Sequence, residues 1–306
     1  MFLLNLSIVQ FLDEAKIEYV QNALMSDNTS FKIGGPADFL CLPQKVEQLK
    51  SLLKFCRENE VPYFVLGNGS NLLVSDLGIE GIVISLKHFN DISYNPAYEI
   101  TCGAGIKLSK LCSFALENSL SGLEFAWGIP GTVGGAIYMN AGAYGGEISF
   151  VLKECTFIDE EGNVVQADLS SLQLGYRKSI FTDSKKVIIS ATFKLKNDRK
   201  ENIRAVMDDL IERRRTKQPL EFPSAGSTFK RPTGHFAGAL IEECGLKGTQ
   251  IGGAQVSEKH AGFVINTGDA TCSDVLSLIS KIKQEVYLQT SVTLEPEVKT
   301  VGRFGI

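Results

Sequence analysis

A glycine-rich stretch from Gly128 to Gly146 restricts what this chain can fold into more than any other segment. It reads GIPGTVGGAIYMNAGAYGG, and seven of its nineteen residues are glycine. Glycine loses much backbone freedom on folding, so domains concentrate it where the backbone turns sharply or lies close against another group. Consecutive N–H groups in such a loop suit phosphate oxygens, and a helix expected over residues 136–140 adds positive charge at its N-terminus. The alternative is a tight loop between two packed elements.

A second glycine loop lies upstream, in the sequence VLGNGSNLLV at residues 65–74. The apolar runs 63–66 and 72–74 on either side predict buried strands. A hairpin turn is the alternative, because Asn-Gly is a common hairpin signal. Neither loop has the Gly-Lys-Ser/Thr of a P-loop or the Gly-x-Gly-x-x-Gly of a dinucleotide-binding βαβ unit. Two phosphate-compatible loops of unusual type favour a long, diphosphate-bearing cofactor held between two lobes.

The length, composition and net charge limit the classes of protein to which this chain can belong. With 306 residues the chain is long enough for two or three domains, and its 44% apolar and 22% charged residues are typical of a globular protein. A net charge of −4 argues against broad binding of nucleic acid or anionic membranes. The apolar N-terminus lacks a basic region and a cleavage site, and it predicts an amphipathic helix with Leu3, Leu6, Val9 and Leu12 on one face. No run approaches transmembrane length, so we expect a cytoplasmic protein.

The numbers and spacing of the cysteines and histidines indicate a protein without a histidine metal site, in a reducing compartment. The three histidines are too few and too dispersed for a histidine metal site, and no metal is expected. The seven cysteines are scattered and form no C-x-x-C pair, which indicates free, mostly buried thiols in a reducing compartment. They are Cys41, Cys56, Cys102, Cys112, Cys155, Cys244 and Cys272.

The periodicity of apolar residues predicts a mixed α+β chain. An early strand–helix–strand order indicates a small α/β lobe, and from Glu147 the pattern changes to strands. A charged junction at 197–200 is the best candidate for a domain boundary, and Pro296 restricts the strand-like tail 292–299 to an edge. Helices are expected at 46–59, 108–118, 202–215, 237–243 and 271–288, and strands at 39–42, 61–66, 82–86, 99–102, 151–158, 186–195, 251–256 and 263–265.

Four places carry charged or hydroxyl groups in contexts that suggest chemistry. Arg177 lies among apolar and aromatic neighbours, where a guanidinium needs an anionic ligand or a structural salt bridge. The basic run 213–217 ends a helix, and it either caps that helix in solvent or faces a diphosphate. Ser227 is followed by a lysine and an arginine, whose charges would help a hydroxyl give up a proton; an ordinary turn is the alternative. The acids around Pro296 are either surface charges or include a catalytic glutamate.

Eight motifs are spread almost from end to end of the chain. They are, in order, NTSFKIGGPAD, LGNGSNLLVSD, GIPGTVGGAIYMNAGAYGGE, GYRKSIF, RTKQP, AGSTFK, GLKGTQIGGAQVS and LEPEVKTVG. In this order they resemble the motifs of the MurB family, the UDP-N-acetylenolpyruvoylglucosamine reductases, which are flavoenzymes of peptidoglycan precursor synthesis.

The resemblance implies an α+β fold with a two-lobed FAD-binding module of the vanillyl-alcohol-oxidase (PCMH) type and a C-terminal α+β substrate-binding domain. The expected bounds are 1–88 for lobe 1, with the tail 292–306 returning to it, 89–197 for lobe 2 and 198–291 for the substrate domain. FAD is expected to be bound non-covalently, because no histidine precedes the glycine loops at a spacing that suggests a covalent link. NADPH is the expected hydride donor.

The resemblance also implies a reaction. The enolpyruvyl ether of UDP-N-acetylglucosamine is reduced to the lactyl ether of UDP-N-acetylmuramate, with hydride passing from NADPH through flavin N5 to the enolpyruvyl methylene carbon. By motif position, Ser227 would protonate C2, and Arg177 and Glu297 would stabilise the enol-like intermediate. A guanidinium offers fixed paired donors to a carboxylate, which agrees with this role. No nucleic-acid, membrane or protein partner is implied.

Binding residues follow from the same motifs. Lys217 would contact the UDP diphosphate. Arg231 stands where some members carry asparagine, and no insertion after the IGGA segment can hold the substrate-covering tyrosine loop, which indicates the compact subtype. Arg231 and His260 are the expected replacement contacts. The cofactor contacts are expected from Gly67, Asn68, Gly69, Ser70, Asn71, Leu72, Gly128, Ile129, Pro130, Gly131, Thr132, Gly134, Gly135, Ala136 and Arg214.

Two other functions remain open on the sequence alone. One is a flavin oxidase on the same module, which would use oxygen, whereas the flavin of a reductase is bleached by NADPH. The other is a non-enzymatic UDP-sugar-binding protein, which would be colourless when purified.

Overall fold

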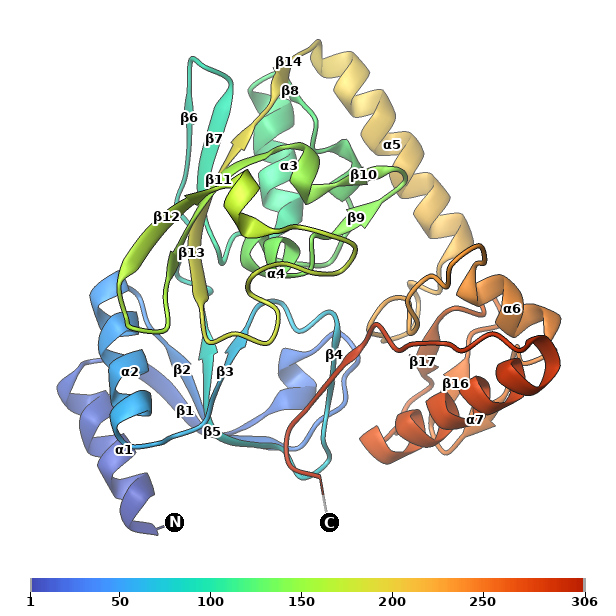
Figure 1. The fold of residues 1–306 in the computed structure, drawn as a ribbon, viewed down its shortest axis with the longest axis horizontal. Coiled ribbons are helices and arrows are strands. Elements are labelled where there is room, and N and C mark those ends of the chain that lie inside the picture. The colour runs from blue at the N-terminus through green and yellow to red at the C-terminus, as the bar shows by residue number, and fades with distance from the viewer. Residues whose placement is uncertain (1, 305–306) are drawn as a thin grey trace. The chain divides into compact units, whose positions relative to one another are not determined.

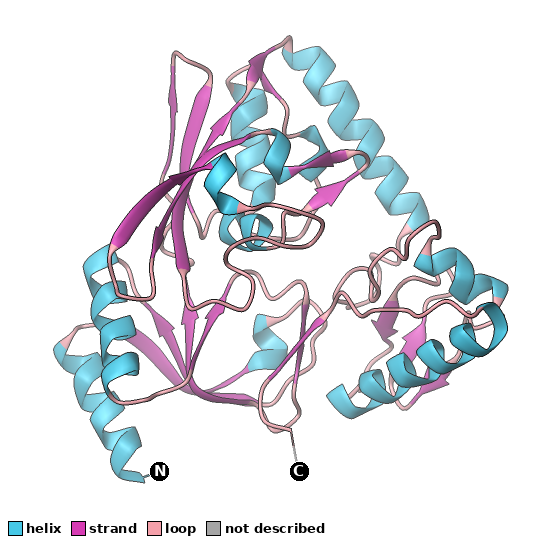
Figure 2. Cartoon of the chain, in the orientation of Figure 1, coloured by secondary structure: helices cyan, strands magenta, loops and turns pink. Residues whose placement is uncertain are grey.

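The computed structural model describes residues 2–304, which form a mixture of helices and strands (Figures 1 and 2). The chain divides into two compact units. Unit 1 contains Met1–Gln21, Phe39–Asn68 and Gly81–Glu212, and unit 2 contains Asn22–Asp38, Gly69–Glu80 and Arg213–Ile306. Neither unit is therefore a continuous piece of chain. The lobe boundaries expected from the sequence stay a prediction.

Unit 1 is built on a five-stranded antiparallel sheet with the order β12-β11-β13-β7-β6. The central strand β13 buries six of its eight side chains, as expected for a strand covered on both faces, whereas the edge strand β12 buries none fully. The strands are β6 (Ile92–Asn95), β7 (Glu99–Gly103), β11 (Leu152–Ile158), β12 (Val164–Asp168) and β13 (Val187–Lys194).

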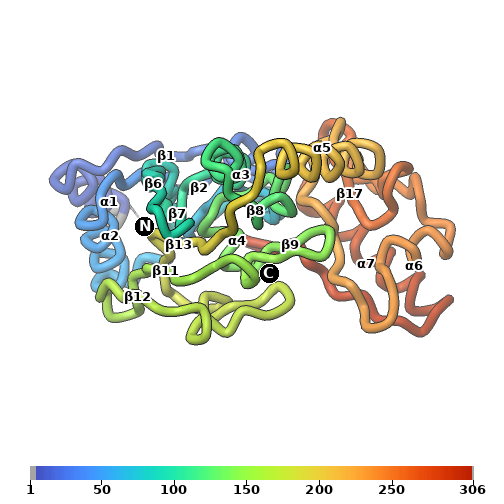
Figure 3. The backbone as a smooth tube through the Cα atoms, turned by 90° about the horizontal axis from the view of Figure 1, so that it is seen from above, coloured from blue at the N-terminus to red at the C-terminus, as the bar shows by residue number. Residues whose placement is uncertain are grey.

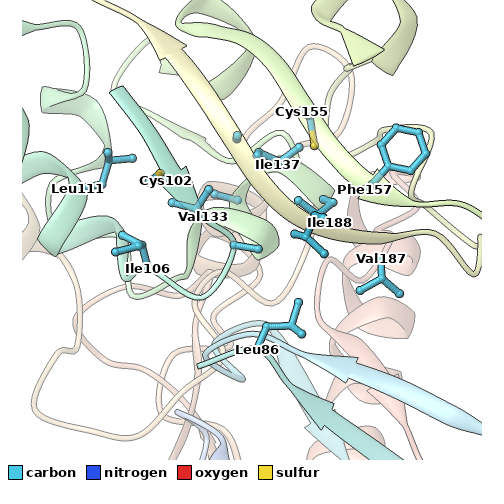
Figure 4. Close-up of a cluster of buried hydrophobic side chains, with 14 of the residues drawn as sticks. Leu86, Cys102, Ile106, Leu111, Val133, Ile137, Cys155, Phe157, Val187 and Ile188 are labelled. Atoms are coloured by element: carbon cyan, nitrogen blue, oxygen red, sulfur yellow. The ribbon is translucent and has the colours of Figure 1, made fainter. Parts of the chain in front are cut away.

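Helices α3 (Leu108–Glu117) and α4 (Val133–Tyr138) lie beside this sheet (Figure 1). Helix α3 buries residues at positions 108, 111, 112, 115 and 116, the spacing of a helix with one apolar face. Figure 4 shows part of the core, where Val133 and Ile137 of α4 lie near Cys102 of β7 and Ile188 of β13. Each fully buried aliphatic side chain of this kind stabilises the fold by about 1.5–3 kcal/mol. The packing fixes the glycine-rich stretch, because α4 lies within it.

Unit 1 also contains α1 (Phe2–Glu14) and α2 (Val46–Glu58), which lie side by side in Figures 1 and 3. The rings of Phe11 and Phe55 stack with their centroids 4.2 Å apart. The predicted N-terminal helix is confirmed, but its predicted face is wrong in part. Leu12 is buried, whereas Leu6 is 53% exposed and Ile8 takes the buried position. The side chain of Leu3 lies outside what the structure describes.

A four-stranded sheet has the order β1-β2-β5-β3, and three of its strands contain a point where the chain passes from one unit to the other. Its strands are β1 (Glu18–Leu24), β2 (Pro36–Leu42), β3 (Tyr63–Leu66) and β5 (Ile79–Ser85). Strand β3 pairs with β5 in parallel, whereas β4 (Leu72–Val74) pairs in parallel with β18 (Lys299–Val301). Because β3 and β4 belong to different sheets, the hairpin alternative for residues 65–74 is wrong.

Unit 2 has its own apolar core around α6 (Ala237–Glu243) and α7 (Cys272–Thr290). A three-stranded sheet of β15 (Gln250–Ile251), β16 (Ala254–Val256) and β17 (Val264–Asn266) belongs to the same unit. Phe31 and Leu73, from its two N-terminal segments, are buried in this core. Helix α7 begins with a capping box, in which the Thr271 hydroxyl accepts the N–H of Asp274 and the Asp274 carboxylate accepts the N–H of Thr271, both at 3.0 Å.

The remaining elements are α5 (Lys200–Lys217) and several short pieces. Five of the six helices predicted after the N-terminal one are confirmed with ends within two residues of α2, α3, α5, α6 and α7, and the sixth, expected at 136–140, is α4 (Val133–Tyr138). The predicted strand at 292–299 is wrong except at its end, because β18 begins at Lys299. No helix among residues 2–304 is both long and apolar enough to span a membrane. The short pieces are strands β8 (Leu120–Ser121), β9 (Gly142–Ala143), β10 (Gly146–Glu147) and β14 (Lys196–Asn197) and 3-10 helices Met25–Asn28, Glu124–Ala126, Ile148–Phe150 and Leu169–Leu172.

Candidate functional site

In unit 1, the end of β3 meets the start of the glycine-rich stretch. The side-chain amide of Asn68 donates to the carbonyl oxygen of Pro130 at 2.8 Å. A Cβ added to Gly67 would lie 2.7 Å from Oγ1 of Thr132, which is closer than Cβ atoms approach other atoms. Thr132 is the N-cap of α4. The two glycine loops predicted from the sequence therefore touch here, and a side chain at position 67 would force the Thr132 hydroxyl to shift.

The N-terminal amides of α4 are already used within the protein. The N–H groups of Val133 and Gly134 donate to carbonyl groups just before α3, at 2.8 and 2.9 Å. The N–H of Gly135 donates to Oγ1 of Thr132 at 3.5 Å. The helix also begins at Val133 rather than at residue 136. A contribution of Gly134, Gly135 and Ala136 to cofactor binding, which stays a prediction, would therefore come from close approach of bare backbone rather than from donated hydrogen bonds.

The first glycine loop does present donors. The N–H groups of Asn68, Gly69 and Ser70 donate to no acceptor within the described part of the chain. Gly69 has φ of +62°, and a left-handed residue in such a run turns successive N–H groups toward one side. A Cβ on Gly69 would lie 2.3 Å from the carbonyl oxygen of Asn28, so glycine is required at this position. Phosphate oxygens would satisfy these donors.

Arg177 is half-buried in a tight turn of unit 1 that is closed by backbone hydrogen bonds between residues 175 and 178. Its backbone is left-handed, with φ of +55°, and its guanidinium carbon lies 5.1 Å from the ring centroid of Tyr176. The side-chain amide of Asn140 donates to the Gly175 carbonyl at 3.1 Å, and the Ser179 hydroxyl donates to the last carbonyl of α4 at 2.8 Å. These bonds hold the arginine turn against the glycine-rich stretch.

Asn140 is a residue of this region that sequence reasoning missed. It is 1% exposed and left-handed, with φ of +41°. Its Oδ1 accepts the N–H of Ser149 at 3.0 Å, and its Nδ2 donates both to Glu147 and to the Gly175 carbonyl at 3.1 Å. An asparagine inside a glycine-rich segment is a signal for a left-handed turn. Its distant partner at 175 has no signal in the sequence.

In unit 2, Ser227 is exposed and precedes the buried Thr228. The N–H of Thr228 donates to the Gly262 carbonyl at 2.8 Å, and its hydroxyl accepts the N–H of Val264 at 2.9 Å. Its carbonyl accepts the N–H of Glu297 at 2.8 Å. Ser227 and Glu297 therefore lie on neighbouring segments that are joined at Thr228, although 70 positions separate them in the sequence numbering.

Glu297 is half-buried, and its carbonyl oxygen accepts a hydrogen bond from the side-chain amide of Asn71 at 3.1 Å. Glu295, on the other side of the proline, is exposed and pairs with Lys230. The structure thus distinguishes two acids that the sequence treated alike. It also shows that the lysine expected to assist Ser227 has a carboxylate partner.

The basic residues of unit 2 differ in burial. Arg214 lies near the end of α5 and is 8% exposed, with Nη1 donating to Oε1 of Gln218 at 3.5 Å. Lys217 is exposed at the end of the same helix. Arg231 is exposed, and its guanidinium carbon lies 3.9 Å from the ring centroid of Phe236. Of these three side chains, that of Arg214 is the one shielded from water.

His260 is half-buried and lies two residues before Gly262, whose carbonyl accepts the N–H of Thr228. Its Nδ1 accepts the N–H of Gly262 at 3.1 Å, and its ring packs edge-on to Phe263 with centroids 5.0 Å apart. Burial is the main cause that lowers the pKa of this imidazole from 6.5. The lowered pKa and the acceptor role of Nδ1 both favour the neutral ring with its proton on Nε2.

The residues named from the sequence are thus divided between the units. Arg177 belongs to unit 1, and Ser227, Glu297, Arg214, Lys217, Arg231 and His260 belong to unit 2. The unsatisfied N–H groups of the first loop and the bare backbone at Gly67 fit the diphosphate of a dinucleotide such as FAD.

Comparison with known proteins agrees with this reading of the loops. A family model described as FAD binding domain matches residues 37–168. A model described as UDP-N-acetylenolpyruvoylglucosamine reductase, C-terminal domain, matches residues 218–301. The UDP-N-acetylenolpyruvoylglucosamine reductase of Clostridium novyi (strain NT) is 48% identical over 299 residues, which cover 98% of this chain and 96% of that protein. This chain belongs to the UDP-N-acetylenolpyruvoylglucosamine reductase family.

Further reductases support the assignment. The protein of that name from Clostridium botulinum (strain Langeland / NCTC 10281 / Type F) is 50% identical over 278 residues, covering 91% of this chain and 90% of that protein. The crystal structure of UDP-N-acetylenolpyruvylglucosamine reductase (MurB) from Thermus caldophilus matches with a TM-score of 0.80 and 37% identity, covering 93% of this chain and 98% of that one. The family predicted from the eight motifs is confirmed.

The fold extends beyond the reductase family. A variant of berberine bridge enzyme described as a reticuline dehydrogenase matches with a TM-score of 0.51 at 16% identity, covering 63% of this chain and 43% of that one. At this identity the likeness shows the fold alone. The predicted α+β fold, with an FAD-binding module of the vanillyl-alcohol-oxidase (PCMH) type and a further C-terminal domain, is confirmed. As a member of the reductase family, the chain is an FAD-dependent oxidoreductase.

Proposed function

We propose that this chain is an NADPH-dependent UDP-N-acetylenolpyruvoylglucosamine reductase that converts UDP-N-acetylglucosamine enolpyruvate to UDP-N-acetylmuramate. The observation that carries the proposal is the 48% identity to a reductase of this name over 98% of the chain. Two structural features support it. One is the phosphate-compatible first loop, and the other is the pairing of the Ser227 and Glu297 segments.

FAD, when bound, supplies hydride transfer from NADPH to the enolpyruvyl carbon. The chain's residues would hold it through the N–H groups of Asn68, Gly69 and Ser70, through the backbone of the glycine-rich stretch and through Arg214. The Arg214 side chain is 8% exposed, so its guanidinium would present a shielded positive charge to the dinucleotide.

The remaining chemistry belongs to three side chains. Addition of hydride to the enolpyruvyl methylene moves negative charge toward the substrate carboxylate, where the Arg177 guanidinium would neutralise it with two parallel hydrogen bonds. The Glu297 carboxyl group would stabilise the enol-like species by a hydrogen bond. Ser227 would then donate its hydroxyl proton to C2, and the proton would be replaced from solvent, to which Ser227 is exposed.

The rest of the substrate would be held away from the reacting carbon. Lys217 would bind the UDP diphosphate as an exposed cation. Arg231 and His260 would take the place of contacts that the longer subtype makes through its tyrosine loop. A neutral His260 has an Nε2–H that can donate to a substrate oxygen, because Nδ1 is already used. We also propose a reducing, cytoplasmic location, because all seven cysteines are free thiols.

Ser227→Ala tests the assignment. Because the alanine removes only the proton donor, NADPH should reduce the flavin of this variant at the rate of the unchanged protein. Oxidation of the reduced flavin by the enolpyruvyl substrate should slow by about 10²–10⁴, the usual contribution of a general acid. Both half-reactions are followed by flavin absorbance in an anaerobic stopped-flow instrument.

The same instrument provides the control. Thr233→Ala changes an exposed hydroxyl of the loop that follows AGSTFK, and it should leave both half-reactions unchanged. If Ser227→Ala leaves the second half-reaction unchanged, Ser227 is not the proton donor. If NADPH fails to bleach the flavin of the unchanged protein while oxygen readily oxidises a reduced form, the protein is an oxidase and the proposal is wrong.

A further inference from the structure

The backbone of Glu297 is fixed at both of its polar groups. Its N–H donates to the carbonyl of the buried Thr228 at 2.8 Å. Its C=O accepts from Nδ2 of Asn71 at 3.1 Å. A residue whose N–H and C=O are both hydrogen-bonded has little freedom in φ and ψ, so the direction of its Cα–Cβ bond is set.

Asn71 connects this glutamate to the first glycine loop. It directly precedes β4, and its own carbonyl accepts the N–H of Lys299 at 2.9 Å, next to the parallel register in which Lys299 lies opposite Leu72. The residue therefore bonds the tail segment twice, through its backbone at Lys299 and through its side chain at Glu297. The side-chain bond is the one that a substitution can remove without disturbing the strand pairing.

We propose that Asn71 is a positioning residue, whose side-chain amide holds the Glu297 peptide and so aims the glutamate carboxyl group at the substrate. This inference rests on the role proposed above for Glu297. It gives Asn71 a task different from the cofactor contact expected from its motif. It also explains why the loop has an amide at its end: the Glu297 carbonyl needs a donor, which an ionised aspartate lacks and which a serine carries on a shorter side chain.

The consequence is specific to one half of the reaction. Without the Nδ2 donor, the Glu297 peptide loses the hydrogen bond to its carbonyl oxygen, and the carboxyl group samples other directions. A loss of about one hydrogen bond corresponds to about a tenfold slower oxidation of the reduced flavin by the enolpyruvyl substrate. Reduction of the flavin by NADPH does not use Glu297 and should be unchanged.

A double-mutant cycle tests the proposal with Asn71→Ala, Glu297→Gln and the double variant. If Asn71 acts through Glu297, Asn71→Ala slows oxidation of the reduced flavin by the enolpyruvyl substrate about tenfold when Glu297 is present. In the Glu297→Gln background the same substitution slows this step by less than about twofold. A second readout needs no cofactor: hydrogen exchange of the peptide containing residues 295–299 should accelerate in Asn71→Ala. FAD affinity should be unchanged. If Asn71→Ala fails to fold, Asn71→Asp, which keeps the volume but lacks the donor, enters the same cycle.

A matched control is Asn59→Ala. Asn59 is an exposed asparagine at the end of α2, whose side-chain amide also donates to a backbone carbonyl, that of Phe55 at 2.9 Å. The Asn59→Ala substitution should alter neither flavin reduction by NADPH nor flavin oxidation by the enolpyruvyl substrate. Equal slowing by Asn71→Ala in both backgrounds, no slowing at all, or weakened FAD binding as its main effect would each overturn the inference. If Glu297→Gln itself turns over normally, the role of Glu297 in the proposed function is wrong instead.

Discussion

His260 shows how local packing sets the charge of a single side chain. Its Nδ1 accepts the N–H of Gly262 at 3.1 Å, and burial lowers its pKa from 6.5. Protonation would place a hydrogen on Nδ1, where it would face the N–H that now donates to it. The native structure therefore favours the neutral imidazole, and the unfolded chain binds a proton at a higher pH than the folded protein does.

This difference predicts a pH dependence of stability. Well above pH 6.5 His260 is neutral in both states and contributes no pH dependence, and the free energy of unfolding should fall as the pH drops through 6.5 toward the lowered native pKa. His260→Asn, which can still accept the Gly262 N–H, should flatten the curve in that range. Urea unfolding at several pH values measures it. His235→Asn changes an exposed histidine and serves as the control; equal slopes for the His260 and His235 variants would contradict the prediction.

At the scale of elements, Gly67 is the point where two loops meet. A Cβ at this position would lie 2.7 Å from Oγ1 of Thr132, so Gly67→Ala should push the end of β3 away from the N-cap of α4. The N–H donors at 68–70 would move with it. We expect FAD affinity to fall by at least about tenfold, since a hydrogen bond to a charged group contributes about 1.5–3 kcal/mol.

A flavin fluorescence titration measures this effect. Melting of the cofactor-free protein separates it from a general loss of stability, because the expected change is in the FAD-dependent rise of the melting temperature. A variant that retains full FAD affinity would show that the contact between the loops is not needed.

Five helices of this chain, α2, α3, α5, α6 and α7, could be predicted to within two residues from apolar faces with regular spacing and local end signals such as the Thr271 capping box. Helix α4 begins three residues before its predicted start, because the glycine-rich stretch has no such pattern. The site could be predicted only as a set of motifs. Nothing in the spacing of residues 71, 228 and 297 shows that they bond one another, because such contacts depend on how distant segments pack. The N-terminal helix shows a smaller failure of the same kind, since Ile8 rather than Leu6 faces the core.

For the whole molecule, the important fact is that both units are assembled from distant segments. In unit 2, Phe31 and Leu73 are 2% and 0% exposed and belong to the same core as α6 and α7. Strand β4 has β18 as its partner. The residues matched by the reductase C-terminal model, 218–301, are therefore not a detachable addition to the rest of the chain.

Removal of residues 218–306 tests this dependence. The shortened chain keeps every segment of unit 1 but loses the apolar core around Phe31 and Leu73, where each buried side chain contributes about 1.5–3 kcal/mol. We expect saturable FAD binding to be lost, because β4 and the donor loop before it no longer have β18 beside them.

The reactivity of the cysteine thiols tests separately whether unit 1 is folded in the shortened chain. The shortened chain keeps five cysteines, all in the core of unit 1, and burial raises the pKa of each thiol to about 12: Cys41, Cys56, Cys102, Cys112 and Cys155. If unit 1 folds by itself, they should stay unreactive toward a thiol reagent in the shortened chain and react only in denaturant. Cys244 and Cys272 are removed with residues 218–306 and do not contribute to the count. Full FAD affinity in the shortened chain would show that β4 holds its loop without its partner strand, and rapid labelling of all five thiols would show that unit 1 needs the removed residues to fold.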